Sequence, residues 1–167
     1  AQAEDHGGLV SPYHFTTAAV AVGPRGAQPS LLLGTAEGEL LAYDPDGQRQ
    51  WSRTFPARLN DLCSVDVDGD GVDEVALARE DDTAALLSHD GDVIWEQTLE
   101  FYRRAPHANL VRTGDLDGDG TPEIVVGGNN WRFYAFTAHG EELWNYEAVH
   151  PSRSGVVADL DGDGKDE

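Results

Sequence analysis

The chain of 167 residues is poor in several residue types, and each shortage removes a class of protein. It contains one cysteine, Cys63, so it forms no internal disulfide, and neither a haem attachment motif nor a zinc ribbon is supported. Cys63 lies in a strand-like run, where we interpret it as a small buried apolar residue. No apolar run approaches the length of a membrane span, so we expect none.

Positive charge is also scarce. Eleven Lys and Arg residues face 31 Asp and Glu residues, for a formal net charge of −20, and Lys165 is the single lysine. Such an excess of negative charge disfavours nucleic acid and anionic membranes as partners.

The chain does contain a nine-residue sequence motif that occurs three times. Residues 66–74 read DVDGDGVDE, residues 115–123 read DLDGDGTPE, and residues 159–167 read DLDGDGKDE. Carboxylates at positions 1, 3, 5 and 9, a backbone carbonyl at position 7 and Gly at position 6 suit a hard cation that takes oxygen ligands. We therefore predict about three Ca²⁺ sites. Their ligands are Asp66, Asp68, Asp70, Val72 and Glu74; Asp115, Asp117, Asp119, Thr121 and Glu123; and Asp159, Asp161, Asp163, Lys165 and Glu167.

The residues that follow each motif show which type of calcium-binding loop it is. An EF-hand carries its bidentate Glu at position 12 and continues as a helix, but position 12 here is Leu77 or Val126. The following runs, VALA and IVV, are short and apolar and predict buried strands. The helical EF-hand and dockerin interpretations are therefore set aside.

A second motif, Gly-x-x-x-Trp, repeats with a similar spacing, at residues 47–51, 91–95 and 140–144. Each glycine ends a turn between strand-like runs, as in a β-hairpin. Four strand-like runs in each period of about 44–49 residues predict an all-β fold of propeller blades with four antiparallel strands. A β-solenoid is the alternative. The predicted division is an N-terminal extension at 1–14, blades at about 15–55, 60–99 and 109–148, and the start of a fourth at 154–167.

The acidic loops followed by an apolar strand resemble the FG-GAP/VCBS repeats of integrin-α-like propellers. The turn glycine followed by tryptophan, with Leu-Ala-Tyr-Asp at 41–44, resembles quinoprotein (PQQ)-like blades. These resemblances imply the propeller fold and calcium binding, and they imply that Trp51, Trp95 and Trp144 dock on the neighbouring blade. Complete propellers have at least four blades, so we expect part of a larger propeller, or a partial one that closes by association between copies.

Two features favour a secreted, cell-surface or periplasmic location. Residues 1–5 resemble the mature end left after removal of a signal peptide. Loops of this kind also suit the millimolar calcium outside cells.

The propeller geometry places the acidic loops and the Gly-x-x-x-Trp turns on one face. The opposite face then carries the connections between blades, where arginines and aromatic residues gather. The candidate ligand-binding residues there are Arg58, Tyr102, Arg103, Arg104, His107, Trp131 and Arg153. Guanidinium groups beside aromatic rings suit anionic sugars such as uronates. The alternative is that these arginines are solvated or pair with local acids.

Two functions follow. The first is a non-catalytic, calcium-stabilised extracellular module for adhesion, assembly, or binding of a glycan or protein at the loop face. The second is part of a secreted polysaccharide-degrading enzyme, because propeller-type rhamnogalacturonan lyases, which the chain resembles only in its acidic loops, carry similar ones. A lyase needs a base, and His107 beside Arg103 and Arg104 is the one plausible cluster.

Overall fold

Twelve strands make up the regular structure of residues 13–167, the part of the chain that the computed structural model describes. No helix occurs among these residues, and so no helix there is long and apolar enough to cross a membrane. Most of the predicted N-terminal extension, residues 1–12, lies outside the described residues, as does the sequence that resembles a processed terminus.

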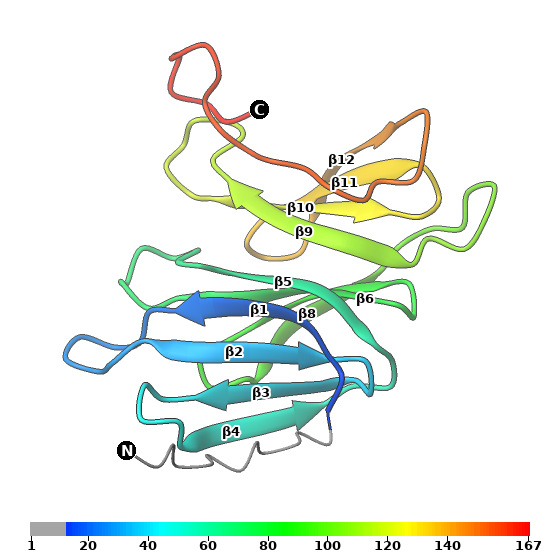
Figure 1. The fold of residues 1–167 in the computed structure, drawn as a ribbon. Helices are drawn as coiled ribbons and strands as arrows, with labels where there is room; N and C mark the ends of the chain where they lie inside the picture. Colours follow the sequence, from blue (N-terminus) through cyan, green and yellow to red (C-terminus); the bar gives the residue numbers. More distant parts are fainter. Residues whose placement is uncertain (1–12) are drawn as a thin grey trace, which may run out of the picture.

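The strands form three antiparallel four-stranded sheets, and in each sheet the strands follow one another in chain order. Their bounds are β1 (Phe15–Ala21), β2 (Ser30–Thr35), β3 (Glu39–Tyr43) and β4 (Arg49–Thr54); β5 (Leu59–Val65), β6 (Glu74–Arg79), β7 (Thr83–Leu87) and β8 (Val93–Thr98); and β9 (Ala108–Gly114), β10 (Glu123–Gly128), β11 (Arg132–Phe136) and β12 (Glu142–Glu147). We call these sheets blades one, two and three. They stack face to face in chain order (Figure 1), and β5 contacts both β1 and β9. The predicted all-β fold of four-stranded antiparallel blades is confirmed.

The core lies between the blades, and the middle blade contributes to it from both faces. Side chains alternate sides along a strand, so a fully buried strand serves two neighbours at once. On β6, Val75 and Leu77 pack toward blade one, whereas Ala76 and Ala78 pack toward blade three. Because β6 has a neighbouring blade on each side, all six of its residues are buried, including the charged Glu74 and Arg79 at its ends.

Tryptophan and glycine form a repeated joint between consecutive blades. Trp51 of blade one lies against the turn of blade two, so close that a Cβ added to Gly91 would be 2.9 Å from the ring. Trp95 lies in the same way against Gly140 of blade three, where the corresponding distance is 2.8 Å. The Trp95 indole also donates a hydrogen bond of 3.0 Å to the carbonyl of Ala138. Glycine is required in these two turns both by its positive φ and by the ring beside it.

The innermost strands are tied together by one carboxylate. Asp61 on β5 accepts a hydrogen bond from the Thr17 hydroxyl of blade one at 3.2 Å. It also accepts one from the Arg112 guanidinium of blade three at 2.6 Å. Arg112 in turn donates to the carbonyl of Gly155 at 3.0 Å, so this chain of contacts reaches the segment beyond blade three.

That segment is the predicted start of a fourth blade. Residues 154–158 are not a strand, because no second strand among the described residues pairs with them. They still run beside β9, where a Cβ added to Gly114 would be 2.4 Å from a methyl group of Val157. Within residues 13–167 no further sheet covers the outward side of blade three, where Trp144 is 42% exposed.

The tryptophan–glycine joint can be tested with two matched substitutions. Gly91 and Gly47 have φ of 84° and 77° at equivalent turns, but no atom lies within 4 Å of a Cβ at position 47. Both Ala variants therefore carry the same backbone strain, and only Gly91→Ala collides with a ring. We expect Gly91→Ala to lower the free energy of unfolding by about 1–3 kcal/mol more than Gly47→Ala, measured by chemical denaturation in calcium. Equal losses would contradict the joint.

Cys63 on β5 allows a second test. Burial, followed by the nearby charge of Asp61, raises the pKa of its thiol to about 12. At pH 8 the reactive thiolate is then on the order of 10⁻⁴ of the thiol. We expect iodoacetamide to alkylate the native protein far more slowly than the same protein unfolded in guanidinium chloride, followed by mass spectrometry. Similar rates in the two states would show that the thiol is neither buried nor perturbed.

Candidate functional site

Three carboxylate loops, residues 66–74, 115–123 and 159–167, lie at the same end of successive blades (Figure 1). The first loop joins β5 to β6, the second joins β9 to β10, and the third follows the segment beyond blade three. In the first loop Gly69 and Gly71 have φ of 75° and 85°, and the glycines at the same positions of the other loops are also positive. These left-handed residues turn the chain so that successive carboxylates point inward.

Backbone N–H groups hold the carboxylates of each loop in the same arrangement. In the first loop Asp66 accepts hydrogen bonds from the backbone of Gly69 at 2.7 Å and Gly71 at 2.9 Å. The N–H of Val72 donates to Asp70 at 2.7 Å, and that of Val67 donates to Glu74 at 3.2 Å. The same four contacts recur in the second and third loops. The repeated sequence therefore produces a repeated, preorganised set of oxygen atoms.

In every loop three carboxylates bring oxygen atoms within 4.8 Å of one another. The groups are Asp66, Asp68 and Asp70; Asp115, Asp117 and Glu123; and Asp159, Asp161 and Asp163. Calcium binds oxygen at about 2.3–2.6 Å, so one ion can reach oxygens up to about 5 Å apart. The donors are all hard oxygen ligands, with no sulfur or imidazole in any group. The loops therefore have the geometry and the chemistry to hold a metal ion.

The remaining predicted ligands are placed nearby but not in these three groups. Asp119, Glu74 and Glu167 make the backbone contacts of their loops and could complete the coordination. The carbonyl oxygens of Val72, Thr121 and Lys165 stay predicted ligands.

The ninth-position glutamates of the first two loops are buried, which is unfavourable for an unneutralised negative charge. Glu74 and Glu123 are 8% and 4% exposed. Burial raises the pKa of both carboxyls, and the three aspartates of each loop raise the pKa further. A bound cation would remove both causes, because it replaces lost water and neutralises the aspartates.

The role of the aspartate at position 8 of the first and third loops was not predicted. Asp73, at position 8, donates its backbone N–H to the carbonyl of Val22 at 2.8 Å and accepts the N–H of Val22 at 2.7 Å. Asp166 makes the same reciprocal pair with Asp115, at 2.8 and 2.9 Å. Pro122 at this position of the second loop has no N–H to donate. These hydrogen bonds attach the first and third loops to the preceding blade. The sequence feature that could have predicted them is an aspartate at a position that is not a metal ligand.

At the other end of blade three the structure brings together four of the seven predicted ligand-binding residues. The guanidinium carbon of Arg103 lies 5.2 Å from the ring centres of both Tyr102 and Trp131, and that of Arg104 lies 5.4 Å from Trp131. Arg132, which was not predicted, stacks on Tyr102 at 4.1 Å. We call these five residues the arginine–aromatic cluster. Arg132 directly follows Trp131 at the start of β11, and this position next to a predicted residue could have indicated its role.

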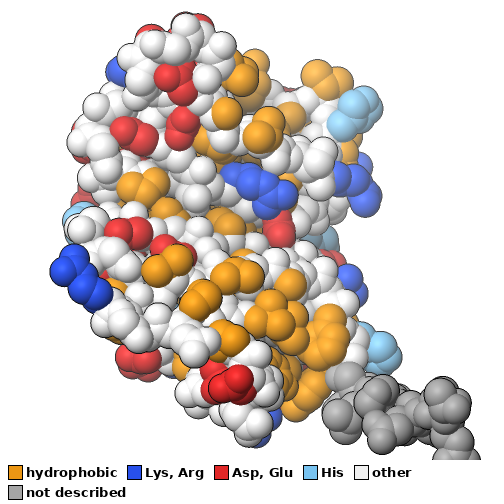
Figure 2. Space-filling model, turned by 60° about the vertical axis from the view of Figure 1, so that its left-hand side comes forward, with side chains coloured by type: hydrophobic (Ala, Val, Ile, Leu, Met, Phe, Trp, Pro, Cys, Tyr) orange, Lys and Arg blue, Asp and Glu red, His pale blue; other side chains and the backbone are white. Residues whose placement is uncertain are grey.

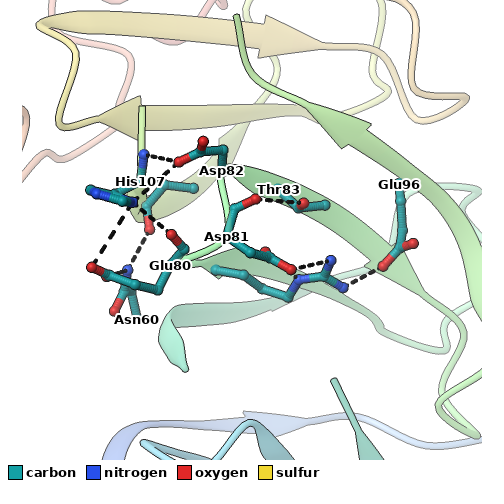
Figure 3. A network of polar contacts seen from close by, with 9 residues as sticks. Asn60, Glu80, Asp81, Asp82, Thr83, Glu96 and His107 are labelled. Carbon is teal, nitrogen blue, oxygen red and sulfur yellow. Dashed lines mark hydrogen bonds and ion pairs between the residues drawn. The ribbon is translucent and has the colours of Figure 1, made fainter. Parts of the chain in front are cut away.

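The other three predicted residues lie apart from this cluster. The backbone N–H of His107 donates to Asp82 at 2.8 Å, and its Nδ1 lies 2.6 Å from the carbonyl oxygen of Glu80 (Figure 3). Arg58 donates to Asn60 at 3.2 Å. No hydrogen bond, ion pair or ring contact within residues 13–167 joins Arg58, Arg153 or His107 to the cluster. His107 instead links the blade-two turn to β9, together with Asn60, which donates to Glu80 at 2.8 Å.

The wider network around that turn is structural. Arg79, whose side chain is 5% exposed, donates twice to Asp81 at 3.0 and 3.1 Å and also pairs with Glu96 (Figure 3). A bidentate carboxylate and a second acid together neutralise this buried guanidinium. Asp81 and Glu96 are thus engaged in holding blade two, whereas Glu80 and Asp82 are the acids that face His107.

Comparison with curated proteins finds resemblance to polysaccharide-acting enzymes. The chain is 28% identical over 131 residues to a lambda-carrageenase of a Pseudoalteromonas species and 27% identical to that of Pseudoalteromonas carrageenovora. Each match covers 78% of this chain but only 13% of the enzyme. The chain therefore spans about an eighth of the length of the curated relatives that it matches.

Comparison with solved structures supports the propeller fold. A rhamnogalacturonan lyase of Bacillus licheniformis has a TM-score of 0.66 at 19% identity, over 92% of this chain and 39% of the lyase. BamB from Moraxella catarrhalis has a TM-score of 0.54 at 19% identity, over 80% of this chain and 37% of BamB. At such identities the likeness is one of fold alone.

The family is shown by the loops themselves. A model of the FG-GAP-like repeat matches residues 66–126 and again residues 115–167, so that the two matches together cover more than half of the chain. Each match contains two carboxylate loops that share the same four backbone contacts. This chain belongs to the FG-GAP-like repeat family.

Proposed function

We propose that the chain is a calcium-stabilised propeller segment of a secreted, polysaccharide-acting protein, to which it contributes binding and assembly rather than catalysis. The observation that carries the proposal is the threefold repetition of a preorganised oxygen cage at one end of the blades. The resemblance to lambda-carrageenases over 78% of the chain supports the polysaccharide context.

Calcium is the cation that suits these cages. Each loop packs four carboxylates into nine residues, and their repulsion opposes the folded loop unless a cation neutralises it. Magnesium gives up its water reluctantly and is rarely held by all-protein cages of this kind. Because loops of this type suit millimolar calcium, the proposal places the protein at the cell surface, in the periplasm or in the medium.

The partners are proposed from the uncovered surfaces. Large apolar side chains are exposed on the outer sides of blade one, including Val20 and Leu31, and of blade three, including Trp144 and Tyr146. Figure 2 shows hydrophobic side chains gathered in its lower half, over blade one. Exposed apolar patches of this kind mark interaction sites, and we assign them to further blades of the same protein or further copies of it. A glycan or protein would bind at the loops on the end away from the carboxylate loops.

The second candidate is a part of a lyase active site, favoured by the likeness to the rhamnogalacturonan lyase. A lyase requires a free base near groups that neutralise a uronate carboxylate. The residues that were candidates for it are divided, since Arg103 and Arg104 contact Trp131 whereas His107 contacts the blade-two turn. This separation favours binding over catalysis.

Calcium removal provides the first test. Binding to the folded state alone stabilises it by about 1.4 kcal/mol per site when free calcium is about ten times Kd. We expect the melting temperature to fall when EGTA is added, and to recover with calcium but not with equal magnesium. A melting curve unmoved by EGTA would contradict a structural role for the sites.

A matched pair of variants assigns that effect to the loops. Asp117→Asn removes one ligand charge, whereas Asp46→Asn makes the same change in a turn outside the loops. We expect Asp117→Asn to reduce the calcium-induced rise in melting temperature and Asp46→Asn to preserve it. Equal effects of the two would point to general charge screening instead.

Incubation with acidic polysaccharides separates the two candidate functions. We expect the calcium-loaded protein to be retarded in native gels containing such a polysaccharide, with no growth of the ultraviolet absorbance of unsaturated products. Growth of that absorbance would support the lyase, and boiled protein serves as its control.

A further inference from the structure

The arginine–aromatic cluster lies where the chain departs from its own repeat. The connection from β8 to β9 is five residues longer than its counterparts, and it supplies Tyr102, Arg103 and Arg104. The turn between β10 and β11 supplies Trp131 and Arg132. Both segments lie at the right of Figure 1, at the end of blade three away from the carboxylate loops.

Aromatic rings hold the three guanidinium groups in place. The guanidinium carbons of Arg103 and Arg104 lie 5.2 and 5.4 Å from the centre of Trp131, and Arg132 lies 4.1 Å from the centre of Tyr102. A guanidinium that stacks on a ring keeps the N–H groups at its edge available to an anion. Stacking also reduces the side-chain entropy that binding would otherwise remove.

The cluster has a surplus of positive charge in a protein of net charge −20. Its one carboxylate partner is Glu147, which pairs with Arg103 at 2.9 Å and accepts the Tyr102 hydroxyl at 2.8 Å. Within the described part of the chain no ion pair engages Arg104 or Arg132.

The backbone is strained at the centre of the cluster. Trp131 has φ of 68° and Arg103 has φ of 60°. Gly38 and Asp82 occupy the position of Trp131 in the equivalent turns of blades one and two, with φ of 87° and 67°, so the turn requires positive φ in every blade and only blade three places a bulky ring there. A bulky residue in this region costs on the order of 1–3 kcal/mol, and such costs are typically retained at functional sites. The Trp131 indole N–H is also buried without a hydrogen-bond partner, which adds to the cost.

A hollow beside the cluster is large enough for a sugar. It has a volume of about 490 Å³ and is lined by Arg103, Trp131, Tyr146, Glu147, Ala148 and Val149. Sulfate and carboxylate groups both accept the paired hydrogen bonds of a guanidinium.

We propose that the arginine–aromatic cluster and this hollow form a binding site for an anionic polysaccharide, with Arg104 and Arg132 contacting its sulfate or carboxylate groups. Trp131 is a positioning residue that fixes the arginines. This inference rests on the proposed function, which it deepens by naming the site and the chemistry of the ligand.

The test is affinity electrophoresis of the calcium-loaded protein in gels containing a sulfated galactan, a polygalacturonate or a neutral galactan. We expect retardation by one or both anionic polymers, weakened by salt, and none by the neutral polymer. The two anionic gels distinguish sulfate from carboxylate recognition. A soluble polyglutamate competitor tests the alternative of an acidic peptide ligand.

Three variants locate the site. Arg104→Ala should weaken binding about tenfold, because it removes a charge-assisted contact. Trp131→Gly should weaken it by about the same factor while the melting temperature stays equal or rises, since charge is kept and the strained φ is relieved. Arg25→Ala, an exposed arginine at the other end of blade one, should bind like the parent protein.

Each outcome supports or overturns the inference. Binding that survives Arg104→Ala and Trp131→Gly would overturn the site while the proposed binding function stands. Absence of binding to both anionic polymers would overturn the site and the binding function together, while the EGTA test still decides the role of calcium. Equal weakening by Arg25→Ala would mean attraction by general charge, and displacement by polyglutamate at equal charge would mean that the ligand is an acidic peptide.

Discussion

The rest of the structure depends on how four carboxylates are held within nine residues. Each loop aims backbone N–H groups at its acids, and the first aspartate accepts two of them through glycine-dependent turns. These dipoles reduce the repulsion without removing it, and the pKa of the buried Glu74 and Glu123 carboxyls is still raised. A bound cation would neutralise the charge that is left. Because Asp73 and Asp166 fasten their loops to the preceding blade, order in a loop is transmitted to the joint between blades.

The contacts between blades follow from the alternation of side chains along each strand. A strand in the middle of a blade is buried on both sides, so its odd and even residues belong to different cores. Val75 and Ala76 are neighbours in sequence, yet each packs toward a different blade. At the outer strand the large ring of Trp51 or Trp95 needs a partner without a side chain, and the turn glycine of the next blade provides it. The blade is therefore a unit that is complete only between two neighbours.

The two ends of the blades carry different charged groups. The acidic loops lie at one end, where they suit a metal ion, and the arginine–aromatic cluster lies at the other. Since the net charge is −20, an anionic polymer is repelled by most of the surface and can approach favourably only where cations are concentrated. The strain at Trp131 lies at that place, in a turn where blade one uses glycine.

The sequence by itself determined the strands and their grouping in fours, because these follow from alternation and turn glycines. Strand β6 (Glu74–Arg79), which contains the apolar run at 75–78, was predictable for this reason. It also determined the carboxylate loops, whose internal hydrogen bonds join residues at most seven apart. Only the tertiary structure decided that Arg132 joins the cluster, that His107 belongs to another blade's turn and that Asp73 binds Val22. These contacts join segments that are brought together by the stacking of blades. Stacking is set by the packing of whole faces, which no local pattern encodes.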